Sequence, residues 1–107
     1  MAGEKLILPK AVEDRGHIWN QYTLRVVGEG RRDALKNHLA AKTIGTEIYY
    51  PVPMHQQECF AYVGTPRESL PVANMLAQQA LSIPIFPELR REQLDEVVAG
   101  IREFFGA

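Results

Sequence analysis

Apolar and polar residues alternate along residues 18–27. Tyr22, Leu24 and Val26 fall on one face of an extended chain, and polar residues lie between them. A period of two with aromatic and β-branched side chains is typical of a half-buried strand. The Gly-Glu-Gly sequence at 28–30 predicts that this strand ends there.

Three further segments have the spacing of helices. The clearest is the last, where apolar residues recur every three or four positions and form one stripe: Leu94, Val97, Val98, Ile101, Phe104 and Phe105. A second helix is predicted from Arg32 to about Lys42, with Gly45 just beyond its end. A third is predicted to begin at residues 69–71, because Pro71 in a first turn lacks only an N–H that would be unpaired anyway. Residues 55–62 indicate a shorter helical turn or two.

Proline limits the two remaining candidate strands. Residues 46–50 predict a short strand that ends at 51–53, because the two prolines there have no N–H for a ladder. Residues 81–86 predict an edge strand or an extended connection. Residues 1–16 have no periodicity and are interpreted as a lead-in segment, so that the domain itself spans residues 17–107.

The resulting order, β-α-β-α-α-β-α, predicts an α/β (α+β) fold. We expect a small, mostly antiparallel three-stranded sheet that three helices cover on one face. Such an arrangement leaves the second face of the sheet bare. A bare face indicates a surface for a partner, either another domain or another subunit.

Composition excludes several classes of function. The 12 basic and 13 acidic residues give a net charge of −1, which offers no reason to expect nucleic acid or an anionic membrane as partner. No apolar run approaches the roughly 20 residues of a membrane span, and the start of the chain lacks a signal-peptide stretch, so we expect a cytoplasmic protein. Cys59 is the only cysteine and is interpreted as a small packed residue. No histidine pair has the spacing of a zinc motif, and no metal site is expected.

Two segments gather side chains that suit a ligand. Residues 17–22 combine aromatic and amide groups at the start of a predicted strand, where the amides could instead satisfy edge groups. Between residues 48 and 55, two prolines stiffen a corner that Tyr49 and Tyr50 precede and His55 follows. This corner suits a ligand with hydroxyls and phosphates, but it also fits a strand-ending turn with half-buried tyrosines. A phosphate loop, a nucleophile elbow and a carboxylate pair are all missing, so the chain does not resemble a complete enzyme.

The same segments, in the same order, resemble the C-terminal region of DegT/StrS-type aminotransferases. The resemblance covers about residues 17–105. It rests on Asn20-Gln21-Tyr22, on Tyr49-Tyr50-Pro51-Val52-Pro53-Met54-His55, on residues 81–89 and on the closing amphipathic helix. It implies the C-terminal small domain of a fold-type I enzyme that uses pyridoxal phosphate (PLP). Such enzymes move an amino group, usually from glutamate, onto a nucleotide-linked keto sugar.

The resemblance also implies roles for individual residues. In this family the lysine that forms the Schiff base lies on the large domain, which has no matching segment in this sequence, so no residue here is expected to be catalytic. Asn20 would reach the cofactor phosphate of the neighbouring subunit in a homodimer. Tyr49, Tyr50 and His55 would line the sugar-nucleotide pocket. The family often has histidine at the position of Tyr49, which leaves a direct role for that phenol open, and some relatives without the lysine perform dehydration instead.

Two hypotheses follow. In the first, the chain is the C-terminal domain of a sugar transaminase and is inactive without its large domain. In the second, it is a stand-alone, non-catalytic binding or dimerisation module that descends from such a domain. The complete-looking core and the methionine at residue 1 motivate the second hypothesis.

Overall fold

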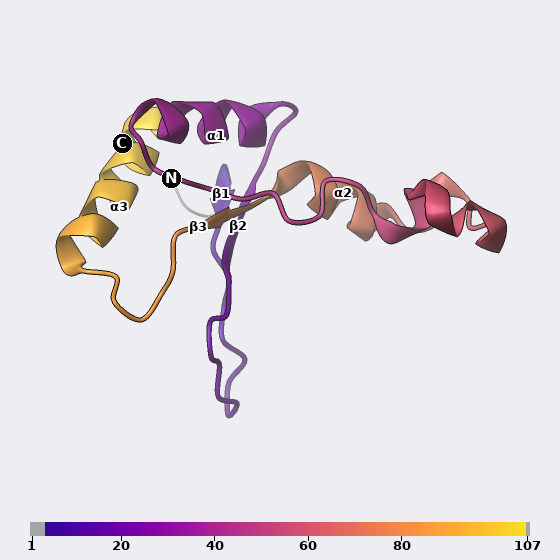
Figure 1. The fold of residues 1–107 in the computed structure, drawn as a ribbon, viewed down its shortest axis with the longest axis horizontal. Coiled ribbons are helices and arrows are strands. Elements are labelled where there is room, and N and C mark those ends of the chain that lie inside the picture. Colours follow the sequence, from indigo (N-terminus) through magenta and orange to yellow (C-terminus); the bar gives the residue numbers. More distant parts are fainter. Residues whose placement is uncertain (1–3, 107) are drawn as a thin grey trace.

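A three-stranded antiparallel sheet forms the centre of the molecule (Figure 1). The structure is a computed structural model and describes residues 4–106. Its strands and α-helices, in chain order, are β1 (Leu6–Ile7), β2 (Tyr22–Val26), α1 (Arg31–Ala41), α2 (Pro71–Gln79), β3 (Ala80–Ile83) and α3 (Arg91–Phe105). Three 3-10 turns lie between α1 and α2: Met54–Gln56, Glu58–Val63 and Arg67–Ser69. β2 is the middle strand, and the predicted small α+β fold is confirmed.

The third strand is not the one that the sequence pattern predicted. Residues 46–50 make only one isolated bridge to β3, in which the backbones of Glu47 and Ser82 exchange hydrogen bonds of 3.0 and 2.9 Å. The ladder stops after this pair, and Pro51 and Pro53, which follow, have no N–H to extend it. The missing strand is β1, which pairs with the other edge of β2 and lies inside the segment that was predicted to be a lead-in.

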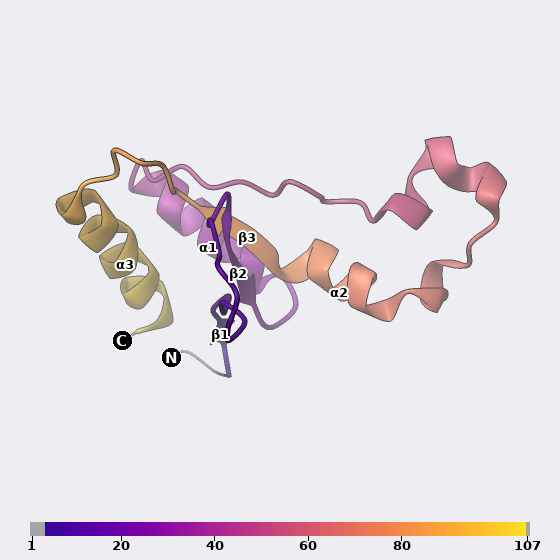
Figure 2. The same cartoon turned by 90° about the horizontal axis from the view of Figure 1, so that it is seen from below.

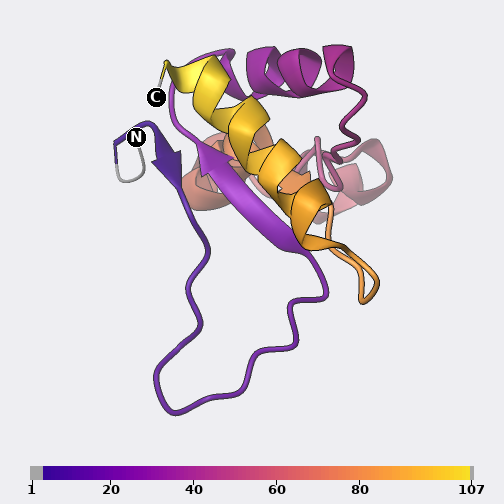
Figure 3. The same cartoon turned by 90° about the vertical axis from the view of Figure 1, so that its left-hand side faces the viewer.

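The core lies between one face of the sheet and two helices. α1 and α3 both pack there, and in Figure 3 α3 lies nearest the viewer and runs alongside β2. Eight hydrophobic side chains are buried: Leu6, Leu24, Val26, Leu35, Leu39, Leu81, Val97 and Ile101. The two helices approach closely at Gly100, where an added Cβ would meet Leu39 Cδ2 at 2.9 Å. The predicted stripe on the last helix is confirmed for Val97 and Ile101, which are buried in the core, and for Phe104 and Phe105, which pack against it. Leu94 and Val98 remain partly exposed.

The expectation that all three helices cover the same face is corrected. α2 contacts β2 from the other side, where Thr23 and Ser82 join their hydroxyls at 2.8 Å. The second face is thus partly covered by α2 rather than bare. Beyond α2, the three 3-10 turns project away from the core as an arm, residues 51–70 (Figures 1 and 2). This projection explains a radius of gyration of 15.6 Å, which exceeds the roughly 13 Å of a compact domain of this length.

Arg32, at the start of α1, joins α1 to the end of α2. Its side chain is buried, and Nη1 donates to the carbonyl oxygens of Ala77 at 2.8 Å and Ala80 at 3.2 Å. Its Nε lies 2.7 Å from Oδ1 of Asp33, which balances the charge. A helix end leaves its last carbonyls without partners, so one guanidinium satisfies both the end of α2 and the start of β3.

Two smaller points follow from the structure. Cys59 is exposed, so the interpretation as a packed residue is wrong: it lies in a 3-10 turn of the arm, away from the core. Within residues 4–106, no helix has the length and apolar content required to cross a bilayer.

We predict that Arg32→Met destabilises the chain by about 2–3 kcal/mol, because two backbone carbonyls lose a charged donor while the buried volume is kept. Arg91→Met is the matched control. Arg91 also pairs with an aspartate, Asp95, but its side chain is 80% exposed, and such pairs contribute little. Urea unfolding followed by circular dichroism measures both free energies, and equal losses in the two variants would contradict this account.

Candidate ligand-binding surface

Asn20 and Tyr49, which are 29 positions apart in the chain, line the same depression. This depression, here called the polar hollow, has a volume of about 400 Å³ and lies at the β3 edge of the sheet. Its other lining residues are Gln21, Gly45, Thr46, Glu47 and residues 82–86. The bridge between Glu47 and Ser82 brings the two segments together, because it fixes residues 45–49 beside the end of β3. Asn20 lies two residues before the start of β2 and is exposed.

Tyr50 lies beside Tyr49, with the two rings 6.4 Å apart, but does not line the polar hollow. Both tyrosines line a hollow of about 330 Å³ between β2, β3 and α2, here called the hollow against α2. Both also line a third hollow beside the arm, so Tyr49 lines three adjoining hollows and Tyr50 lines two of them. The phenols are 51% and 74% exposed, so both hydroxyls are available to a ligand. Tyr49, which is half exposed, still fits the alternative of a half-buried tyrosine in a strand-ending turn, whereas Tyr50 is mostly exposed.

His55 is separated from Asn20, because it lies on the arm. Its Nε2 is 3.0 Å from the carbonyl oxygen of Arg67, which directs the N–H toward that oxygen in this tautomer. Arg67 also donates from Nη2 to Gln56 at 2.9 Å, and Asn74 of α2 donates to the Arg67 carbonyl at 2.7 Å. These bonds tie the first and third 3-10 turns to α2. Tyr50 and Gln56 together line a further hollow on the same side.

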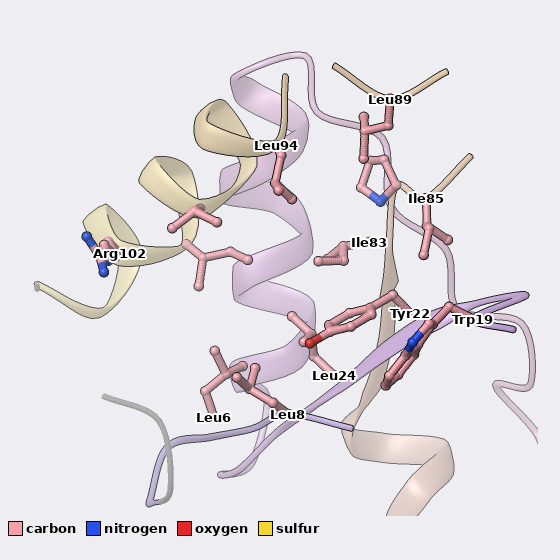
Figure 4. A pocket seen from close by; sticks show the side chains of 13 residues that line it. Leu6, Leu8, Trp19, Tyr22, Leu24, Ile83, Ile85, Leu89, Leu94 and Arg102 are labelled. Carbon is pink, nitrogen blue, oxygen red and sulfur yellow. The ribbon is translucent and has the colours of Figure 1, made fainter. Parts of the chain in front are cut away.

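A larger depression of about 590 Å³, the apolar groove, lies on the core side of the sheet between β1, β2 and α3 (Figure 4). Figure 4 shows Trp19 and Tyr22 along one wall and Leu94 on α3 opposite. The remaining lining residues are Leu6, Leu8, Leu24, Ile83, Pro84, Ile85, Leu89, Val98, Ile101 and Arg102. Arg102 is the only charged member of this lining. An apolar depression of this size on a small domain is the kind of surface that another protein segment covers.

Neither a metal cluster nor a lysine lies in the polar hollow. Within residues 4–106, no group of three or more His, Cys, Asp or Glu could hold a metal ion. Lys36 donates from Nζ to the carbonyl oxygen of Thr46 at 2.8 Å, and Lys42 pairs with Glu103 on α3. The hydrogen bond from Lys42 lowers the pKa of Glu103. The polar hollow can therefore bind a ligand through amide, phenol and backbone groups, but it contains no amine nucleophile.

Sequence reasoning missed several residues of this surface. Glu47, Thr46 and Phe86 line the polar hollow, and Gln21 lines both it and the hollow against α2. Gln21 belongs to the motif that carries the resemblance, which was a usable signal. No signal in the sequence indicated the pairing of Glu47 with Ser82, because no local pattern specifies a single bridge.

The fold matches the C-terminal domain of aminotransferases whose structures have been solved. The structure superposes on Streptomyces venezuelae DesV in complex with a ketimine intermediate, with a TM-score of 0.87 and 39% identity, over 94% of this chain and 26% of that one. It also superposes on a DegT/DnrJ/EryC1/StrS aminotransferase from Brucella abortus, with a TM-score of 0.86 and 30% identity, over 97% of this chain and 27% of that one.

The chain belongs to the DegT/DnrJ/EryC1/StrS aminotransferase family, whose profile matches residues 2–102. It is 43% identical over 103 residues to a protein named pleiotropic regulatory protein from Geobacillus stearothermophilus, covering 96% of this chain and 27% of that protein. It is 41% identical over 102 residues to a UDP-N-acetyl-3-dehydro-α-D-glucosamine 3-aminotransferase from Acidithiobacillus ferrooxidans, covering 95% and 26%. The chain thus spans about a quarter of the length of these relatives, and the predicted resemblance is confirmed.

We predict that the isolated chain binds a hydrophobic dye such as 1-anilinonaphthalene-8-sulfonate in the apolar groove. The double variant Leu94→Ser, Val98→Ser should lower the dye fluorescence by about half or more, because both side chains are partly exposed on the groove wall. Val72→Ser on α2 is the control, since Val72 is exposed but lies outside the groove. Equal fluorescence in both variants would show that the groove does not bind the dye.

Proposed function

We propose that this chain is the C-terminal domain of a PLP-dependent transaminase that moves an amino group from glutamate to a nucleotide-linked keto sugar. The observation that carries the proposal is the meeting of Asn20 and Tyr49 in one polar hollow, in a chain of this family. Five of the relatives are named as aminotransferases or transaminases of UDP- or dTDP-linked sugars.

The cofactor, when bound, accepts the electrons of the bonds that break at the amino carbon. The contribution of this chain is to hold the phosphate. Asn20 presents an exposed amide at the rim of the polar hollow, and its two N–H groups can donate to phosphate oxygens. The Asn20 amide is the one group of this chain that we assign to the cofactor. A lysine for the cofactor has to come from the large domain, because no lysine lines the polar hollow and the Nζ of Lys36 donates to the Thr46 carbonyl oxygen.

The substrate side of the proposal involves the two tyrosines and His55. The exposed phenols of Tyr49 and Tyr50 can each donate and accept one hydrogen bond with a sugar hydroxyl or a phosphate oxygen. His55 has one ring nitrogen committed to the Arg67 carbonyl, which leaves Nδ1 for the nucleotide. These residues orient the sugar and do not transfer protons.

Two partners complete the proposal. The large domain of the same enzyme covers the apolar groove, since the relatives are about four times as long as this chain and the groove offers an apolar face next to the polar hollow. The enzyme is a homodimer in which Asn20 contacts the cofactor phosphate of the neighbouring subunit. The exposure of Asn20 supports this arrangement, because an amide that faces solvent in one subunit is free to meet another.

We predict that Asn20→Ala, in the complete enzyme, weakens PLP binding about tenfold or more, because a hydrogen bond to a charged phosphate is lost. Asn37→Ala is the control, since Asn37 is an exposed asparagine on α1 that does not line the polar hollow. Cofactor retention during dialysis, followed by absorbance, measures both.

Hybrid dimers test whether the contact crosses between subunits. Asn20→Ala subunits are mixed with subunits that lack the lysine of the large domain. If Asn20 acts on the neighbouring subunit, one of the two sites in each hybrid has both groups and activity returns; if it acts within its own subunit, activity stays low. An enzyme that neither retains PLP nor transfers amines would favour the non-catalytic binding module instead.

We predict that Tyr49→Phe raises KM for the nucleotide sugar about fivefold, through the loss of one hydrogen bond of ordinary strength. The half-reaction with glutamate should be unchanged, because the amino donor does not meet this phenol. Tyr62→Phe is the control, since Tyr62 is 84% exposed on the arm and lines neither hollow. An equal loss in both half-reactions would assign Tyr49 to the cofactor rather than the sugar.

A further inference from the structure

Trp19 has a backbone conformation that bulky residues rarely adopt. Its φ is 50°, in the left-handed region, where the side chain of an L-residue crowds its own backbone. Such a conformation persists only where neighbouring groups hold it, and it commonly occurs beside functional groups. The following residue is Asn20, whose amide lines the polar hollow.

His17 supplies two of the contacts that hold Trp19. The backbone N–H of Trp19 donates to Nδ1 of His17 at 2.9 Å. The imidazole also stacks on the indole, with ring centroids 3.9 Å apart and an angle of 25° between the planes. Tyr22 contacts the indole as well, at 5.1 Å between centroids, and Figure 4 shows the two rings side by side. A local hydrogen bond and two ring contacts thus fix one strained residue.

The strained residue separates two surfaces. The side chain of Trp19 lines the apolar groove, whereas the adjacent Asn20 lines the polar hollow. The direction of a side chain follows from the φ and ψ of its own residue and of the preceding one. A return of Trp19 to an ordinary extended φ would therefore turn Asn20 away from the polar hollow.

We infer that His17 is a positioning residue: its Nδ1 and its ring keep Trp19 left-handed and thereby aim the Asn20 amide into the polar hollow. The hydrogen bond requires Nδ1 to be unprotonated, so the proton of the neutral ring lies on Nε2. The inference about geometry stands on this chain alone. The inference that this geometry serves the cofactor phosphate rests on the proposed function.

Two variants separate the hydrogen bond from the ring. His17→Asn keeps an acceptor close to the place of Nδ1 but removes the ring, whereas His17→Phe keeps a ring and removes the acceptor. His38→Phe is the matched control, because His38 also contacts an aromatic ring, Phe104 at 5.6 Å, but lines neither the apolar groove nor the polar hollow. Each variant is expressed as this chain and checked for its fold by circular dichroism.

NMR and fluorescence measure the geometry directly. We expect the Cα and Cβ shifts of Trp19 and the side-chain amide shifts of Asn20 to move in His17→Phe, and to move less in His17→Asn, which loses the ring contact but keeps an acceptor for the Trp19 N–H. Trp19 is the only tryptophan, so the fluorescence of the chain reports the loss of the imidazole stack in both variants. If the Trp19 and Asn20 shifts in His17→Phe matched those of wild type, the positioning role would be overturned.

Cofactor retention in the complete enzyme then tests the link to Asn20. We expect His17→Phe to weaken PLP binding about tenfold, approaching the effect of Asn20→Ala. The double variant should be no weaker than Asn20→Ala alone, because a residue that acts through another adds nothing once that one is gone. Additive losses would overturn the inference. Shifts that move while even Asn20→Ala retains PLP would instead refute the cofactor role of Asn20 and leave the geometry of His17 standing.

Discussion

The buried guanidinium of Arg32 is the contact on which the arrangement of the ligand-binding surface depends. It holds α1, the end of α2 and the start of β3 at one point, through the carbonyls of Ala77 and Ala80. The arm is joined to the rest of the domain by α2 at one end and by residues 45–50 at the other. Residues 45–50 pair with the sheet through the single bridge at Glu47. A buried charge is costly unless every donor is satisfied, which makes its geometry strict. β3 also ends at the polar hollow, and α2 lines the hollow beside it. The Arg32 side chain therefore helps to fix the positions of these two hollows relative to the core.

The parts of the fold that the sequence predicted are those whose pattern is local. β2 and α3 carry their own period, of two and of about 3.6, and were found where expected because burial imposes that period on every residue. The exchange of β1 for residues 46–50 could not be predicted, since both segments are short and apolar. What decides between them is the partner that each finds along β2 or β3. Among the candidate site residues, Tyr49 and Asn20 were placed together by that same non-local bridge. His55 was set apart by hydrogen bonds to Arg67 and Asn74, which no spacing along the chain reveals.

Trp19 connects the two sides of the domain at a single peptide. Its indole belongs to the apolar groove, and the amide of the next residue belongs to the polar hollow. Under the proposed function, the surface that docks the large domain and the group that holds the phosphate therefore share one backbone segment. A strained residue at that junction limits the ways in which the segment can rearrange, since relaxation of Trp19 would disturb both surfaces at once. Such a segment suits an enzyme whose active site is complete only after its domains have docked.

The distribution of apolar side chains supports the same separation between a surface for a protein partner and a surface for a small ligand. Among residues 4–106, sixteen large hydrophobic residues are exposed and eight hydrophobic residues form the buried core. Scattered exposed apolar residues are normal, but nine of these sixteen lie in the apolar groove or on the arm. A domain whose only task was to bind a small ligand would need one apolar cleft at the ligand and would keep the rest of its surface polar. Here the apolar surface extends beyond every hollow that contains Asn20, Tyr49 or Tyr50. Its extent fits a role in which a larger protein surface, rather than a small molecule, covers most of it.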